Sequence, residues 1–168
     1  MSAAARVPAL AAALALCLAL FASLQAPGLA FHDGDQLRMV APAELEVVDG
    51  PLILRWKVSD DVARAVAQRR AYFAVFIDRA PIAPGESLGA LADDGCRRTP
   101  GCPDRAWLAE RRVLVTLSSA VRVGVLPDGG WGADGRGHEA TVVLMAADGT
   151  RWGEAATGVR FLSPEESA

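Results

Sequence analysis

The sequence predicts an all-β chain that folds as an antiparallel sandwich of about seven strands and is preceded by an N-terminal hydrophobic helix. Three observations support this prediction. Residues 7–31 contain no charged side chain. Residues 52–58 alternate between apolar and mixed positions, which is the period of a half-buried strand. Short apolar runs then recur between turn residues, as is typical of antiparallel sandwiches.

The uncharged N-terminal stretch follows a single basic residue, Arg6. A cleavable signal peptide has a short positive start, an apolar centre of about 7–15 residues and small residues at its cleavage site. Gly28 and Ala30 suit cleavage after Ala30, whereas the long apolar centre approaches the roughly 20 residues of a membrane-spanning helix. Residues 1–30 are therefore predicted to be a signal peptide or a signal anchor. Both alternatives place the rest of the chain outside the cytoplasm.

The rest of the chain is long enough for one domain, because domains of 100–150 residues are common and bury a sufficient core. We expect a short linker over 31–39, the sandwich over 40–162 and a disordered tail over 163–168. Without residues 1–30 the chain keeps 16 basic and 20 acidic side chains. This acidic balance argues against nucleic acid as a partner, since phosphate binding needs clustered excess lysine and arginine.

The first half of the predicted domain contains four strands. Short apolar runs cover residues 37–40 and 45–48, and Asp49-Gly50-Pro51 then marks a turn. Leu52, Leu54, Trp56 and Val58 share one face of the next strand. Residues 60–70 break this pattern and predict a short helix, which Asp60 could cap. Aromatic and β-branched residues over 71–77 predict the following strand.

The second half alternates between irregular segments and strands. Residues 79–111 are predicted to be a long irregular connection, because Pro81 and Pro84 disfavour a regular strand. Residues 127–138 contain five glycines and are predicted to be a loop. Asp148-Gly149 is a hairpin signal, and Val159 and Phe161 are candidate core residues of the last strand. The remaining strands are expected over 112–117, 121–126, 139–147 and from 151 onward.

Two segments carry a resemblance to a known family. The sequences PAELEVVDGPLILRWKV and GHEATVVLMAADGTRWGEAATGVRFL resemble the opening strands and the last hairpin of bacterial extracytoplasmic immunoglobulin-like or fibronectin type III-like domains. The resemblance covers residues 40–162 and implies a sandwich of that type. It departs from antibody domains, because no Cys-Trp-Cys arrangement links the two sheets.

Two cysteines follow the N-terminal segment, Cys96 and Cys102, in the sequence CRRTPGC. Thiols this close should pair outside the cytoplasm, where disulfides persist. For so short a loop the chain-entropy estimate is about 2–2.5 kcal/mol. We therefore predict a structural disulfide between Cys96 and Cys102. The spacing is not C-x-x-C and no neighbouring helix is evident, which disfavours redox catalysis.

No sequence motif indicates an enzyme or a resident cofactor. The chain lacks a G-x-S-x-G elbow, an H-E-x-x-H pair and a P-loop. Residues 128–139 have the length of a calcium loop, and Asp128 and Glu139 stand at its ends. Gly130 and Gly132, however, occupy positions that should supply oxygen ligands. A flexible hairpin loop is the favoured interpretation.

A small periplasmic metal-binding protein, holding copper or calcium, is the alternative function. Its ligands would be His32, His138 and a nearby carboxylate from Asp33, Asp35 or Asp134. Cleavage after Ala30 would leave Phe31 at the terminus, so the terminal amine and His32 could not chelate copper together. Because His138 starts a strand next to Glu139, we expect it to lie at the surface.

The main hypothesis is a non-enzymatic, secreted or membrane-tethered sandwich that contacts a protein or another component of the cell envelope. Its expected contact surface comprises residues 79–111 and 127–138, because loops on a rigid sandwich commonly carry function. Trp131 stands between glycines and is the candidate partner contact, since tryptophan is frequent at binding hot spots. Membrane contact is expected only through residues 7–31, if they are retained.

Overall fold

The computed structural model describes residues 36–124, 126, 130–132 and 135–164. The predicted signal peptide or signal anchor lies outside these residues, as do the last four residues of the predicted tail. None of the helices in the described part of the chain is long and apolar enough to cross a bilayer.

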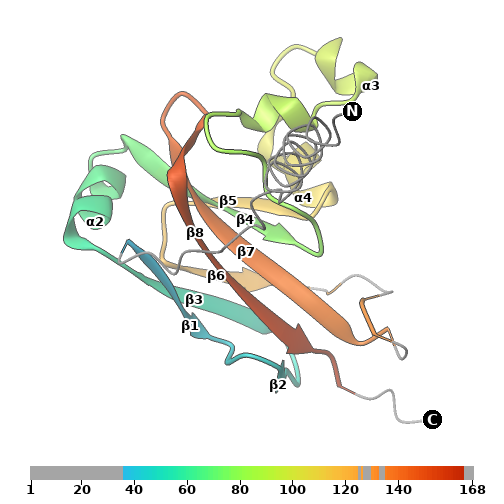
Figure 1. The fold of residues 1–168 in the computed structure, drawn as a ribbon. Helices are drawn as coiled ribbons and strands as arrows, with labels where there is room; N and C mark the ends of the chain where they lie inside the picture. Colours follow the sequence, from blue (N-terminus) through green and yellow to red (C-terminus); the bar gives the residue numbers. More distant parts are fainter. Residues whose placement is uncertain (1–35, 125, 127–129, 133–134, 165–168) are drawn as a thin grey trace, which may run out of the picture. The chain divides into compact units, whose positions relative to one another are not determined.

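The described residues form two sheets that face each other (Figure 1). The smaller sheet has the strand order β1-β3-β6, with β1 at Leu37–Ala41, β3 at Leu52–Val58 and β6 at Ala120–Val123. The larger sheet has the order β2-β8-β7-β4-β5, with strands at Glu46–Val47, Arg151–Leu162, Gly137–Ala146, Ala71–Ile77 and Val113–Thr116. The prediction of a mainly β sandwich is confirmed.

The strand expected over 37–40 is present as β1, and its buried Leu37 side chain brings the end of the expected linker into the core. One detail of the predicted sandwich is corrected: β2 pairs with β8 in parallel, so the sandwich is not wholly antiparallel. The chain turns after β1 at Leu45, which has a φ of 60°, and crosses from the smaller sheet to the edge of the larger one.

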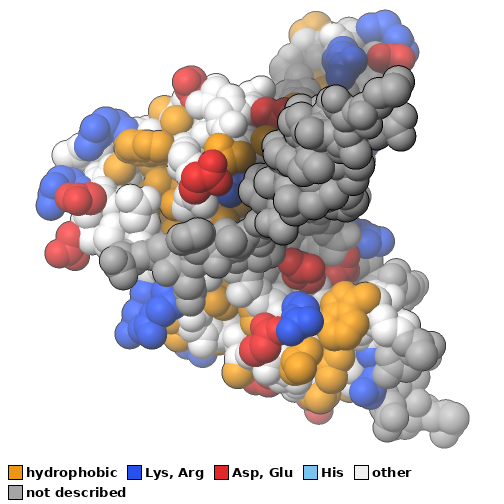
Figure 2. Space-filling model, in the orientation of Figure 1, with side chains coloured by type: hydrophobic (Ala, Val, Ile, Leu, Met, Phe, Trp, Pro, Cys, Tyr) orange, Lys and Arg blue, Asp and Glu red, His pale blue; other side chains and the backbone are white. Residues whose placement is uncertain are grey.

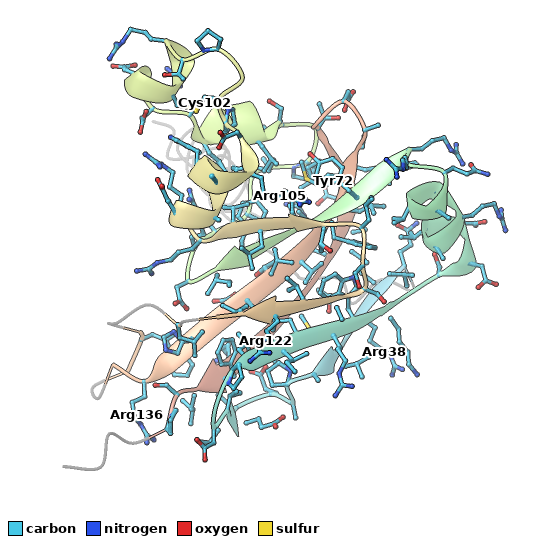
Figure 3. All side chains as sticks on the ribbon, turned by 180° about the vertical axis from the view of Figure 1, so that it is seen from behind. Arg38, Tyr72, Cys102, Arg105, Arg122 and Arg136 are labelled. Carbon is cyan, nitrogen blue, oxygen red and sulfur yellow. A yellow bond between two sulfur atoms is a disulfide. The ribbon has the colours of Figure 1, made fainter. Side chains whose placement is uncertain are left out.

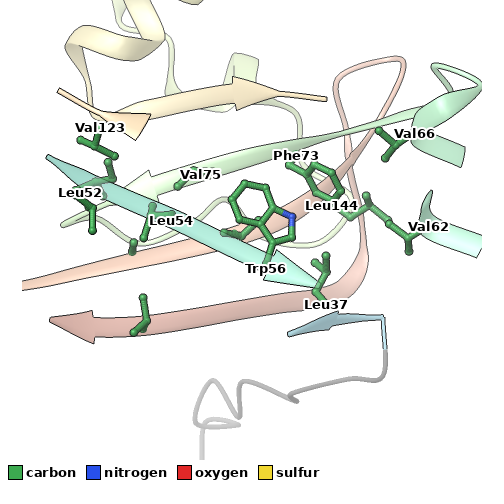
Figure 4. Packing of buried hydrophobic residues seen from close by; sticks show 14 of the residues in the cluster. Leu37, Leu52, Leu54, Trp56, Val62, Val66, Phe73, Val75, Val123 and Leu144 are labelled. Atoms are coloured by element: carbon green, nitrogen blue, oxygen red, sulfur yellow. The ribbon is translucent and has the colours of Figure 1, made fainter. Parts of the chain in front are cut away.

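The main core lies between the two sheets (Figure 4). The inward positions of β3 alternate as predicted, with Leu52, Leu54 and Trp56 buried. Trp56 meets Phe73 of β4 edge to face, with the ring centroids 5.3 Å apart. The predicted core residues Val159 and Phe161 of β8 are also buried in this cluster. The Trp56–Phe73 pair therefore joins the smaller sheet to the larger one.

A short helix closes one side of this core, as the sequence predicts. Helix α2 spans Asp60–Ala67 and buries Val62, Ala65 and Val66. Its N-cap is Ser59, whose hydroxyl accepts from the Val62 N–H, and not Asp60 as expected. Ser59 has extended backbone angles that suit a cap. Asp60 lies in the first turn, where its negative charge interacts favourably with the positive end of the helix dipole.

The outer face of the larger sheet carries a second, smaller core. Residues 78–112, which we call the helical excursion, pack Ile82, Leu88 and Leu108 against this face. The excursion was predicted to be irregular, but it contains three short helices: η1 at Leu88–Leu91, α3 at Asp94–Arg97 and α4 at Arg105–Glu110. Asp93 and Asp104 cap α3 and α4 through their carboxylates. The described chain is thus layered as sheet, sheet and helical excursion.

Two arginines hold the excursion in place through hydrogen bonds to backbone carbonyls. Arg151 of β8 is buried and donates to the Ile82 carbonyl at 2.6 Å. Burial lowers the pKa of the Arg151 guanidinium. Arg79 donates to the Arg111 carbonyl at 2.8 Å, which ties the start of the excursion to its end. These bonds hold the excursion as a fixed third layer.

Candidate binding cleft

The predicted disulfide is confirmed and braces the helical excursion. Cys96 and Cys102 are bonded, with their Cα atoms 5.3 Å apart. Cys96 is buried within α3, which corrects the expectation that no helix adjoins this pair. The turn of α3 is short and is fixed by the Asp93 carboxylate, which accepts from the Cys96 N–H at 2.8 Å. A second brace is Arg111, which pairs with Asp93 at 2.8 Å.

A cleft of about 500 Å³ lies between this braced excursion and the larger sheet. This volume is within the range of ligand sites in proteins. Leu88 of η1, Leu108 of α4 and Val115 of β5 supply apolar walls. Figure 3 labels Tyr72 and Arg105, which line the cleft from β4 and α4. The cleft exists because the excursion folds back over the sheet.

Five polar side chains line the cleft: Tyr72, Ser87, Arg105, Thr116 and Asp148. Among the described residues, the hydroxyls of Tyr72 and Ser87 have no hydrogen-bond partner, whereas that of Thr116 accepts from the Ser118 N–H. Arg105 donates to the Val115 carbonyl at 3.1 Å and so covers part of the edge of β5, an outermost strand of the larger sheet. The lining therefore offers a cation, an anion and three hydroxyls around an apolar interior.

The two acidic groups of the cleft have shifted pKa values in opposite directions. Burial raises the pKa of the Tyr72 phenol, and the nearby Asp148 charge raises it further. The pKa of Asp148 is lowered, first by the Thr150 N–H and then by the Thr150 hydroxyl, which donate to it at 2.9 and 2.7 Å. At neutral pH the cleft thus presents a phenol O–H beside a carboxylate.

The titration of Tyr72 tests this arrangement directly, because the chain contains one tyrosine. Phenolate absorbance of the folded protein should rise at a higher pH than that of free tyrosine. Asp148→Asn should move the midpoint back toward the free value without reaching it, since burial remains the larger cause. A wild-type midpoint at or below the free value would show that the phenol is solvated and the cleft is open to water at its base.

His138 lies in a buried pair and not at the surface. It is 2% exposed, and its ring stacks on Phe161 with the centroids 5.6 Å apart. Its Nδ1 lies 2.9 Å from Oδ2 of Asp78, while Oδ1 of Asp78 accepts from the Glu139 N–H at 2.9 Å. The expectation was wrong because His138 occupies an inward position of β7, whose next inward residue is Ala140. The pair fixes the start of the excursion to β7.

Trp131 lies against the start of β7. Its N–H donates to the Gly137 carbonyl at 2.7 Å, and the Gly137 N–H donates back at 2.9 Å. A Cβ built on Gly137 would lie 2.2 Å from the Trp131 ring, so the indole requires glycine there. Trp131 nevertheless keeps 43% of its surface exposed. Its role as a partner contact stays a prediction.

The metal hypothesis rests mostly on residues outside the described part of the chain. His32, Asp33, Asp35 and Asp134 lie there, as does Asp128 of the calcium-loop interpretation. Within residues 36–164, where described, no group of three or more His, Cys, Asp or Glu side chains could hold a metal ion. Of the ligands expected for this hypothesis, His138 is the one in the described part of the chain, where it is buried beside Asp78.

Sequence reasoning missed the cleft because its lining comes from segments far apart in the chain. Tyr72, Ser87, Arg105 and Asp148 belong to β4, the excursion and the β7–β8 turn. The capping aspartates at positions 93 and 104 were the available signal for helices in the excursion. Comparison of the whole sequence with protein-family models and with curated proteins finds no match to either.

Proposed function

We infer that this chain is a non-enzymatic binding module that works outside the cytoplasm, either released or tethered by its N-terminal segment. The cleft is the observation that carries this proposal. Its apolar walls are rimmed by a cation, an anion and three hydroxyls, two of which, on Tyr72 and Ser87, have no hydrogen-bond partner among the described residues. A polypeptide segment fits this lining, because it combines apolar side chains with backbone donors and acceptors.

Strand order supports an immunoglobulin-like type of sandwich. Constant-type domains place their first, second, fourth and fifth strands in one sheet, and their third, sixth and seventh in the other. When the two-residue β2 is set aside, β1, β3 and β6 match the first, second and fifth strands, and β4, β7 and β8 match the third, sixth and seventh. The fourth strand, β5, departs from this order because it pairs with β4 in the larger sheet. The disulfide of this chain lies within the excursion and not between the sheets. We therefore propose an immunoglobulin-like domain whose third layer adds the cleft.

Site-specific photocrosslinking in the producing cell tests the cleft. A benzophenone amino acid at Leu117, which is 48% exposed and lines the cleft, should give defined adducts with a protein partner. The same probe at the exposed Arg64 of α2 is the matched control. Ser87→Phe should abolish the Leu117 adducts by filling the cleft, with circular dichroism unchanged. Identical adducts from both positions, or adducts that survive Ser87→Phe, would contradict the proposal.

N-terminal sequencing of the protein recovered from the same cells tests the compartment. Cleavage after Ala30 would leave Phe31 as the first residue, whereas a retained anchor would leave the start of the chain intact. Either product should be protected from protease in intact cells with an envelope barrier and digested once that barrier is opened. Protein recovered with the cytoplasm, with its N-terminus uncleaved, would overturn the extracytoplasmic placement.

A further inference from the structure

The outer face of the smaller sheet carries only one sign of charge. Arg38 of β1, Arg55 and Lys57 of β3 and Arg122 of β6 are exposed and point away from the core, opposite the buried positions of their strands. No acidic residue occurs in these three strands. We call this surface the basic face. It stands out because the whole chain has a net charge of −3.

Strand register brings these four cations together. Arg38 and Lys57 are directly opposite each other across β1 and β3. Arg122 is opposite Ile53, which makes it a diagonal neighbour of Arg55 at a typical distance of about 7–8 Å. Like charges at such positions destabilise a sheet. Their clustering is therefore not explained by the stability of the fold.

The cations of the basic face are not neutralised within the described part of the chain. Ion pairs in the described part of the chain involve Arg64, Arg97, Arg111, Arg112 and Arg160, and Arg136 also has a partner; none of these residues is on this face. Charged side chains of both signs are visible on the side of the molecule seen in Figure 2. Figure 3 shows the opposite side, with Arg38 and Arg122 labelled. The basic face thus presents its charge to solvent.

Two exposed apolar side chains accompany the cations. Val40 is 48% exposed and Ile53 is 49% exposed, on β1 and β3. Apolar side chains set among cations are the composition of surfaces that lie on anionic membranes: the cations meet lipid phosphates and the apolar groups enter the headgroup layer. An acidic protein would match the cations, but it would not require the apolar groups.

The short segment between the apolar stretch and β1 also favours a membrane as the partner of this face. The apolar stretch ends at residue 31 and β1 begins at Leu37, so a retained anchor is joined to β1 by five residues. Six residue steps span at most about 20 Å when fully extended. Leu37 is opposite Val58, so the chain enters the smaller sheet at the end where Arg38 and Lys57 lie. An anchored chain would therefore keep this end of the basic face close to the bilayer surface.

We propose that the basic face docks on an anionic phospholipid bilayer. This inference rests on the extracytoplasmic placement proposed above and adds a membrane contact beyond the N-terminal segment. Docking would leave the binding cleft available, because the cleft lies on the opposite side of the larger sheet, against the helical excursion. The module would then hold its cleft turned away from the lipid surface.

Lys57 is the single lysine of the chain and reports on the basic face without any engineered label. The purified protein, with the N-terminus that the producing cell leaves on it, is mixed with vesicles and treated with an amine-reactive acetyl ester. Mass spectrometry then follows acetylation of Lys57. Vesicles with equal parts of phosphatidylcholine and phosphatidylglycerol should slow acetylation severalfold relative to pure phosphatidylcholine vesicles, and high salt should remove the difference.

Charge variants separate docking from simple tethering. Arg55→Gln with Arg122→Gln should restore rapid acetylation, because each lost cation weakens attraction to anionic lipid by about fivefold. Arg64→Gln with Arg97→Gln changes the net charge equally at exposed positions on α2 and α3, and should leave the protection of Lys57 intact. Circular dichroism checks that both variants fold.

Three outcomes would overturn the proposal. Equal acetylation in the two vesicle types would show that the face does not recognise anionic lipid. If Lys57 were protected to the same extent in the control variant and in the basic-face variant, the effect would be assigned to net charge. Protection by poly-glutamate but not by anionic vesicles would assign the face to an acidic protein. None of these results depends on the adducts formed at Leu117, so the cleft is judged separately.

Discussion

Phe73→Ala is expected to lower the free energy of unfolding by about 3–5 kcal/mol, because it removes a fully enclosed aromatic ring and leaves a cavity. Phe73 is 1% exposed and lies at the centre of the main core. It meets Trp56 across the two sheets and is paired with Leu144 of β7 and Thr116 of β5 through the backbone. Urea unfolding followed by tryptophan fluorescence and by circular dichroism measures the loss.

Two further variants make this expectation specific. Phe73→Leu keeps much of the volume and should cost less than the alanine variant. Ile53→Ala removes a large side chain from the exposed face of β3 and should change stability by no more than about 0.5 kcal/mol. If Phe73→Ala were as mild as Ile53→Ala, the two sheets would not be joined through this aromatic pair.

Asp78→Ala is expected to cost about 3 kcal/mol, because it leaves two donors without their acceptor in a buried place, each worth about 1–3 kcal/mol. These donors are the Glu139 N–H and Nδ1 of His138, both 2.9 Å from the carboxylate. Asp78 also has a φ of 50°, a left-handed conformation that alanine adopts less readily than aspartate. Thermal and urea unfolding of the two proteins at the same pH measure the difference.

Asp78→Asn is the matched control. Asparagine keeps an acceptor for the Glu139 N–H, can donate to His138 after a change of ring tautomer, and tolerates a positive φ. It should therefore retain most of the stability that alanine loses. Equal losses in both variants would mean that the carboxylate charge, and not the pair of hydrogen bonds, stabilises this junction.

The two strands with the clearest patterns were predictable in full: Leu52–Val58 has one buried and one exposed face, whereas Ala71–Ile77 is buried on both faces. The alternation over Leu52–Val58 and the aromatic run over Ala71–Ile77 gave both strands with the bounds seen in the structure. Short strands at the edges were placed less well: the last residues expected in the run 121–126 lie outside β6, which ends at Val123. Edge strands contribute few core side chains, so their sequences constrain their length only weakly.

Other features depend on contacts that local patterns do not carry. His138 was expected at the surface because it starts a strand next to Glu139, but its position on β7 turns it toward Phe161. The excursion was expected to be irregular because prolines interrupt it, yet its helices form after these prolines and are stabilised by Leu88 and Leu108 in the second core. Tertiary packing overrode composition in both cases.

Of the candidate sites, the disulfide was predictable because Cys96 and Cys102 are close in sequence. The cleft was not, since its polar groups meet only after the excursion folds over the sheet. The basic face was predictable from the sequence only in part. Alternation in β3 already turns Arg55 and Lys57 to one side, but their alignment with Arg38 and Arg122 requires the register of two neighbouring strands.

The strand order also governs when the domain can be completed during synthesis. The two longest strands, β7 and β8, are made last, yet β4 and β2 depend on them for backbone partners in the larger sheet. Until residue 162 has left the ribosome, the first strands therefore lack the surface that buries them. The larger sheet can therefore close only when synthesis of β8 is complete, because its pairings join segments that are far apart in the chain.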